Sequence, residues 1–178
     1  MSKETFNEYI KPFVVLVCIC LVVSFLLAFT NSVTAPIIAE NARLEAIRTR
    51  QKVLPGSLDF EEIDCDTQAL DIDSAYRETN GMGYVITSSH VGYGGGEVTV
   101  TVGIDNDGKV VGISADVSSQ TKGIGSKAGE SSYLDKYMGI SGSADGVDTI
   151  ATATRSSTAV RQSVTAALNA FNTIKGGN

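Results

Sequence analysis

The segment EVTVTVGIDNDGKVVGISADV, residues 97–117, carries the clearest structural pattern in the chain. Its first half alternates apolar residues with small or hydroxylated ones, which is the period of a strand that buries one face. That apolar set consists of Val98, Val100, Val102 and Ile104. The Asn-Asp-Gly triplet that follows is typical of a tight hairpin turn. The second half alternates again, with Val111, Ile113, Ala115 and Val117 on one face, so the segment predicts two antiparallel strands.

Further elements are predicted on both sides of this hairpin. Residues 84–87 predict another strand, which a glycine-rich turn at 93–96 joins to the hairpin. Residues 131–138 predict a short helix. The final segment predicts a longer helix because its apolar residues recur at helical spacing, with Ser156 or Ser157 as a suitable N-cap. These elements indicate an α+β fold in which three or so antiparallel strands pack against helices.

The N-terminal part of the chain contains 28 consecutive uncharged residues, 12–39. About 20 apolar residues in a helix cross a bilayer core, so we expect a short tail at 1–11 and a single transmembrane helix at 12–34. A cleaved signal peptide is the main rival. Its apolar region would span only about 7–15 residues before a small-residue cleavage site, and the nearest such site here is followed directly by Pro36.

The segment after this apolar run alternates charges and is predicted to be helical up to Pro55-Gly56. We therefore expect a helical stalk at 35–56 and a separate domain at 57–178. Residues 57–80 are acidic and show only weak periodicity.

Composition excludes several classes of protein. The chain has 14 basic and 20 acidic side chains, a net charge of −6, and residues 1–39 contribute none of it. An acidic domain argues against a nucleic-acid partner, which needs a basic surface to displace counterions. Three cysteines, two of them in the apolar run, do not form a disulfide framework. A single histidine excludes a multi-histidine metal site, and no metal site is predicted.

The loop at 147–157 is rich in hydroxyl groups and leads into the final helix. The free N–H groups and positive dipole end of a helix N-terminus favour a phosphate, and Arg155 can add a charge-assisted contact. An over-supplied helix cap with solvated threonines explains the same pattern equally well. The loop at 118–129 has the composition of a flexible surface loop, although it also offers many backbone donors and hydroxyl groups.

From Asp148 to Ser157 the chain reads Asp-x-Ile-x-x-Ala-Thr-x-Ser-Ser. This resembles the flavinylation motif of the FMN-binding domain, which occurs in the G subunit of the Rnf electron-transport complex and in the C subunit of sodium-pumping NADH:quinone reductase. In that family a threonine hydroxyl is joined to the FMN phosphate by a phosphoester bond, and the matching position is Thr154. The usual Ser-Gly before Ala-Thr is replaced here by Ala151-Thr152.

The resemblance extends over nearly the whole chain. Other matching segments are 31–41, 53–56, 92–95 and 103–109. Residues 120–125 occupy the place of the family's Glu-Thr-Pro-Gly-Leu-Gly loop beside the flavin, with Gln120 in place of the acid and Lys122 in place of the proline. If Lys122 faces the flavin ring, it favours the anionic reduced form and raises the flavin potential. Besides Thr154, the resemblance implies a cofactor-binding set of Thr121, Lys122, Gly123, Ile124, Gly125, Asp148, Ala153, Arg155, Ser156 and Ser157.

The resemblance implies a membrane-anchored electron carrier with covalent FMN and no catalytic residues of its own. It would be a redox subunit of an Rnf-type ferredoxin:NAD+ oxidoreductase coupled to Na+ or H+ translocation. The implied partners are the other redox and membrane subunits of the complex, membrane lipid, and the flavin transferase that attaches FMN from FAD.

The resemblance also places the chain in the cell membrane as a single-pass protein with an extracytoplasmic FMN domain. The basic residues that follow the span favour the opposite topology. Three other functions are a subunit of a Na+-pumping NADH:quinone reductase, a stand-alone extracytoplasmic flavin reductase, and a tethered binding domain without cofactor.

Overall fold

The computed structural model describes residues 11–176, so almost all of the expected tail at 1–11 lies outside the described residues. The chain divides into two compact units, Met1–Ala46 and Ile47–Asn178. Helix α2 (Lys11–Val53) is continuous and contains Pro36. By length and composition it is apolar enough to cross a membrane. The expected spanning helix and stalk are thus parts of one helix, whose last turns belong to the second unit.

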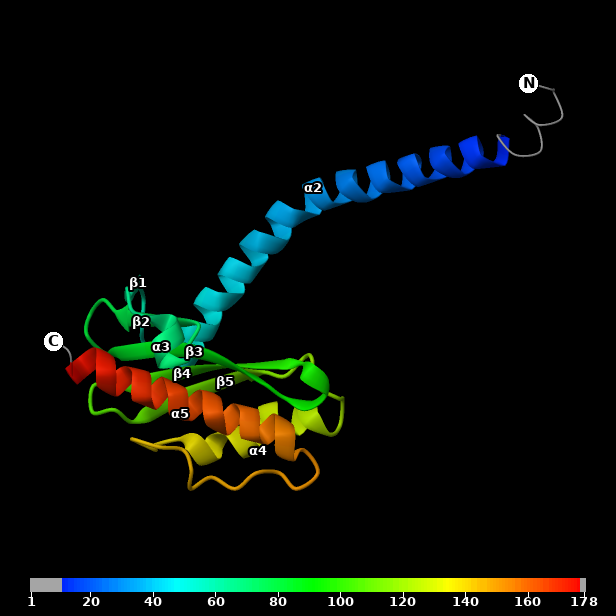
Figure 1. Cartoon of the computed structure of the whole chain (residues 1–178). Coiled ribbons are helices and arrows are strands. Elements are labelled where there is room, and N and C mark those ends of the chain that lie inside the picture. Colours follow the sequence, from blue (N-terminus) through cyan, green and yellow to red (C-terminus); the bar gives the residue numbers. More distant parts are fainter. Residues whose placement is uncertain (1–10, 177–178) are drawn as a thin grey trace. The chain divides into compact units, whose positions relative to one another are not determined.

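The second unit is built on a five-stranded antiparallel sheet in the order β1-β2-β3-β4-β5 (Figure 1). The strands are β1 (Phe60–Glu62), β2 (Ser74–Glu78), β3 (Gly83–Val91), β4 (Glu97–Asp105) and β5 (Val110–Asp116). The shorter helices are α3 (Thr67–Leu70) and α4 (Ser131–Leu134), and the last helix is α5 (Thr154–Gly176). The predicted fold class, an antiparallel sheet with packed helices after an N-terminal apolar helix, is confirmed. β1 and β2 were not predicted from the sequence. β1 is a three-residue edge strand with little burial, and the buried residues of β2 are Ala75 and the charged Glu78, which give no apolar alternation.

Helix α5 lies across one face of the sheet, over β3 and β4, and closes the main core (Figure 1). Alternation along β4 places Val98, Val100, Val102 and Ile104 in this core, as predicted. The buried face of α5 contributes Val160, Val164, Leu168 and Phe171. One face of a strand pair and one stripe of a helix therefore bury each other.

The alternation along β5 departs from the prediction at one position. The pairing between β4 and β5 shifts next to Gly103 and Ile104, because Gly103 pairs with Gly112 while Ile104 pairs with Val110. Val111 is the extra residue of this bulge, and a bulge reverses which side chains face the core. Val110 therefore lies in the main core, and Val111 packs against a smaller cluster formed by Val53, Leu54 and Val85.

The buried carboxylate of Glu78 is held by hydrogen bonds in the turn after β2. It accepts hydrogen bonds from the Met82 N–H (3.1 Å) and from Asn80 Nδ2 (2.9 Å). The Met82 N–H contributes most to holding the pKa of Glu78 below its ordinary value, and it outweighs the opposing effect of burial. A depressed pKa in the folded state stabilises the fold above the unfolded pKa, and this stabilisation is lost as pH falls through the folded value.

We expect the Glu78→Gln variant to lose the acid-dependent part of the domain's stability. The wild-type melting temperature should fall more steeply than that of the variant as pH drops below about 4.5, the ordinary glutamate value. Thermal unfolding of the full chain in detergent, measured from pH 3 to 7, checks this. Glu97→Gln, at an exposed strand position, is the matched control. Parallel pH profiles for wild type and Glu78→Gln would contradict the expectation.

Candidate functional site

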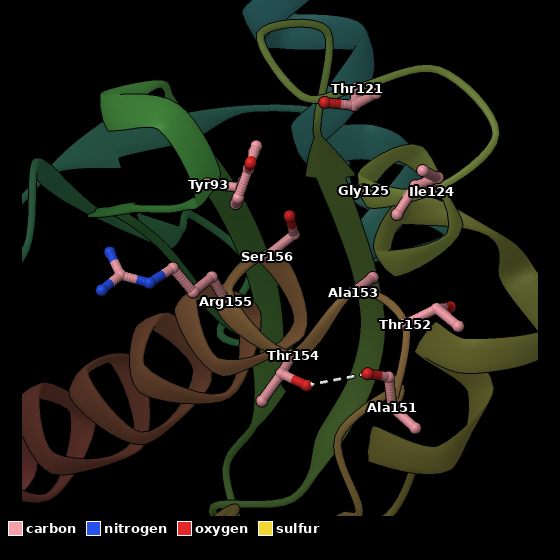
Figure 2. Close-up of a pocket in the computed structure, with 10 residues that line it drawn as sticks. All are labelled: Tyr93, Thr121, Ile124, Gly125, Ala151, Thr152, Ala153, Thr154, Arg155 and Ser156. Carbon is pink, nitrogen blue, oxygen red and sulfur yellow. Dashed lines mark hydrogen bonds between the residues drawn. The ribbon is translucent and has the colours of Figure 1, made fainter.

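A cavity of about 620 Å³ lies at the N-terminal end of α5. Three segments form its walls: the turn after β3, the loop after β5, and the loop that leads into α5 (Figure 2). The lining residues are Tyr93, Thr121, Ile124, Gly125, Ala151, Thr152, Ala153, Thr154, Arg155 and Ser156. A volume of this size is typical of sites for small molecules and cofactors.

Hydroxyl groups fold the loop in front of α5. Thr154 Oγ1 donates to the carbonyl oxygen of Ala151 at 3.1 Å (Figure 2). Ser157 Oγ accepts from the Ile150 N–H at 3.0 Å and donates to the Ala153 carbonyl at 2.9 Å. The helix therefore begins at Thr154, and the prediction that Ser156 or Ser157 is the N-cap is wrong. Both serines lie inside the first turn with buried side chains, because their hydroxyls bind neighbouring loops.

Two threonine hydroxyls face the cavity from this loop. Thr152 and Thr154 both line the cavity and both are exposed. The first N–H groups of α5 have no acceptor within the helix and carry its positive dipole end. Arg155 is exposed beside them, and Figure 2 shows its guanidinium directed away from the other lining side chains. This end of the cavity combines hydroxyl oxygens, free N–H donors and positive charge, which suits a phosphate.

The upper part of the cavity carries large apolar side chains. Tyr93 is 63% exposed and Ile124 is 50% exposed, and Figure 2 shows them on opposite sides of the opening. Exposed side chains of this size at a cavity mouth offer flat apolar area to a ring system. The cavity therefore has one end with hydroxyl groups and helix N–H groups, which suits a phosphate, and one apolar end.

Seven of the eleven residues in the predicted cofactor set line this cavity. They are Thr121, Ile124, Gly125, Ala153, Thr154, Arg155 and Ser156. Lys122 and Gly123 are exposed in the same loop without lining it, Asp148 is exposed, and Ser157 is buried with its hydroxyl already bonded. Sequence analysis did not assign Tyr93, Ala151 or Thr152 to the site. A single aromatic residue in a turn of four glycines was the available signal for Tyr93.

Comparison with known proteins relates these segments to a family. A family model described as the FMN-binding domain matches residues 92–169, which include all ten residues that line the cavity. A relative from Acetobacterium woodii, named as the G subunit of the Na(+)-translocating ferredoxin:NAD(+) oxidoreductase complex, is 34% identical over 140 residues. The match covers 70% of this chain and 67% of the relative.

Proposed function

The chain belongs to the FMN-binding domain family, and we propose that it is a membrane-anchored electron-transfer flavoprotein whose FMN is covalently attached to Thr154. The observation that carries this proposal is the position of Thr154. Thr154 is exposed and lines the cavity as the first residue of α5, beside the helix N–H groups that favour a phosphate.

The cavity fits FMN in size and in the distribution of its chemistry. Tyr93 and Ile124 provide apolar walls for the isoalloxazine, and Thr121 and Gly125 complete that end. The first N–H groups of α5 and the Arg155 guanidinium favour the phosphate at the other end. The hydroxyls of Ser156 and Ser157 donate to protein oxygens, so in this arrangement the backbone N–H groups supply the donors to the phosphate and Arg155 adds positive charge nearby.

Attachment from FAD needs one substitution at phosphorus. Thr154 Oγ1 forms an ester bond with the phosphorus on the FMN side of the FAD pyrophosphate. The pyrophosphate P–O bond breaks, AMP leaves, and the hydroxyl proton is lost. A flavin transferase is the proposed catalyst and partner for this step. The Thr154 hydroxyl donates to the Ala151 carbonyl at 3.1 Å and lies 3.4 Å from the Ile150 carbonyl oxygen, and both contacts are exposed. Freeing the hydroxyl proton therefore costs only about 1 kcal/mol.

The bound FMN supplies the redox chemistry, and the protein holds and orients it. The ten lining residues include no carboxylate, imidazole or thiol. Such a cavity lacks the proton-transferring groups of most catalytic sites, which favours electron transfer over turnover of a small substrate. The covalent bond keeps the cofactor on the protein when the domain is exposed to solvent.

We further propose that the chain is a subunit of an Rnf-type ferredoxin:NAD+ oxidoreductase that translocates Na+ or H+. The similarity to the Acetobacterium woodii protein supports this assignment. The partners are then the other redox and membrane subunits of the complex. Helix α2 supports anchoring in the cell membrane through lipid contact. The proposed extracytoplasmic side of the FMN domain is implied by the family resemblance.

Spectroscopy and mass spectrometry of the purified full chain test the flavin assignment. We expect a flavin absorption band that survives denaturation, and a mass increment of FMN minus water on the peptide that contains Thr154. A colourless protein would indicate a cofactor-free binding domain. A flavin that separates from the protein on denaturation would still support FMN binding but would contradict the covalent bond. Co-purification with sister subunits separates the complex from a stand-alone reductase.

Lys122 is expected to have only a small effect on the flavin potential. Its ammonium is exposed and does not line the cavity, so solvent and salt screen its charge. We expect Lys122→Ala to lower the midpoint potential slightly, and the difference to shrink as ionic strength rises. Redox titration of the flavin at low and high salt checks this. A large, salt-independent decrease would show that Lys122 contacts the ring directly.

A further inference from the structure

We infer that the side-chain amide of Gln120 is a positioning residue that holds the three walls of the flavin cavity at a fixed separation. The amide is 5% exposed and lies behind the cavity rather than in its lining. It connects the turn after β3, its own loop and the first turn of α5. The inference rests on the proposed function, because the cavity it shapes is the one assigned to the flavin.

Four hydrogen bonds surround this amide. Oε1 accepts from the Tyr93 N–H at 3.0 Å and from Ser156 Oγ at 2.7 Å. Nε2 donates to the Gly96 carbonyl at 2.9 Å and to Ser119 Oγ at 3.0 Å. An amide has two donor hydrogens and two acceptor sites, so all of its capacity is used. The bonds reach Tyr93 and Ser156, which both line the cavity on different segments.

The orientation of the amide follows from its partners. The Tyr93 N–H can only donate and the Gly96 carbonyl can only accept, so Oε1 must face the first and Nε2 the second. The Ser156 hydroxyl must then donate its single proton to Oε1. Its hydroxyl therefore presents only lone pairs to the cavity, and a ligand group at that point has to be a donor.

Three glycines leave room for the Gln120 side chain because they have no Cβ atoms. A Cβ at Gly92 would lie 2.6 Å from Gln120 Oε1, and a Cβ at Gly125 would lie 2.9 Å from Gln120 Cβ. A Cβ at Gly96 would lie 3.0 Å from Gln120 Nε2. The turn after β3 thus approaches the amide closely, and Gly125 of the same loop packs against the Gln120 Cβ. A side chain of another length would change the distance between the walls.

Replacement by methionine keeps a similar side-chain length and removes every hydrogen bond of the amide. The Tyr93 N–H, the Gly96 carbonyl and the Ser156 hydroxyl would then lose their buried partner, which costs free energy. The Gln120→Met variant is therefore expected to release the turn that carries Tyr93. Gln162→Met makes the same chemical change at an exposed position of α5 and serves as the matched control.

Hydrogen exchange tests the network without any flavin. In flavin-free Thr154→Ala protein, studied as the full chain in detergent by NMR, the side-chain NH₂ of Gln120 should exchange about tenfold more slowly than that of Gln162. Adding Gln120→Met should speed exchange of the Tyr93 N–H by a similar factor, and Ser156→Ala should do so to a smaller extent. Equal exchange rates for the Gln120 and Gln162 amides would overturn the inference.

Flavin spectroscopy then separates a positioning role from a purely structural one. In protein that carries the flavin, Gln120→Met should reduce the circular dichroism of the flavin absorption bands and shift the midpoint potential, whereas Gln162→Met should change neither. Faster Tyr93 exchange with unchanged flavin dichroism and potential would overturn the positioning role. If wild-type protein carries no flavin, the proposed function fails and the inference fails with it, while the exchange rates would still report whether the network exists.

Discussion

Replacing Thr154 with alanine is expected to abolish covalent flavin attachment and leave the domain folded. The substitution removes the only atom through which the proposed ester forms at this position. It also removes an exposed hydroxyl that donates its one proton to the Ala151 and Ile150 carbonyls, so the stability loss should stay within about 1 kcal/mol. Absorption after denaturation, peptide mass and thermal unfolding of the full chain in detergent measure attachment and folding separately.

Thr152→Ala is the control for this experiment. Thr152 presents a second exposed hydroxyl on the same cavity wall, two residues earlier. The variant should retain the covalent flavin, although its amount can fall if the transferase contacts this residue. Loss of the flavin in Thr152→Ala together with retention in Thr154→Ala would place the attachment at Thr152 and refute the assignment. Thr154→Ser keeps a hydroxyl at the same position and should retain at least part of the flavin.

Of the substitutions proposed here, Gly103→Ala is expected to lower the free energy of unfolding the most. Gly103 and its partner Gly112 form a pair without side chains on the sheet face opposite α5. The last residue of α2, Val53, lies against this pair. A Cβ at either glycine would come within 2.7 Å of the Val53 carbonyl carbon and closer still to its oxygen. Backbone atoms cannot rotate away as a side chain can, so the end of α2 must shift.

The expected loss of stability follows from the buried side chains that a shift of α2 would expose. Val53 is 0% exposed and Leu54 is 3% exposed, and burying such a side chain contributes about 1.5–3 kcal/mol. Gly103→Ala should therefore destabilise the domain by roughly 2–4 kcal/mol through overpacking and partial exposure. Urea unfolding of the full chain in detergent measures this. Gly146→Ala, at a glycine with open space around it, is the control. A change of less than about 0.5 kcal/mol in Gly103→Ala, the size of an ordinary surface substitution, would show that α2 does not dock on the glycine pair.

Local patterns in the sequence were enough to predict much of the fold. Alternation along β4 assigned its buried face because successive strand residues point to opposite sides, whatever the rest of the chain does. The position of α5 followed from helical spacing in the same way. The predicted buried face of β5 was wrong at Val111, which is the extra residue of a bulge. An extra residue changes the strand pairing without changing the composition of the strand.

The sequence predicts Thr154 as the attachment residue and 120–125 as a loop beside the flavin because short motifs carry both; seven residues of the predicted set line one cavity. The contacts that shape the cavity were not predicted. Tyr93 and Ser156 reach Gln120 across 27 and 36 residues of chain, and the Val53 carbonyl meets a glycine pair on two distant strands. Periodicity and motifs report on residues that are neighbours along the chain. The hydrogen bond from the Ser156 hydroxyl to the Gln120 amide forms only when distant segments pack together. The same holds for the contact between the Val53 carbonyl and the glycine pair.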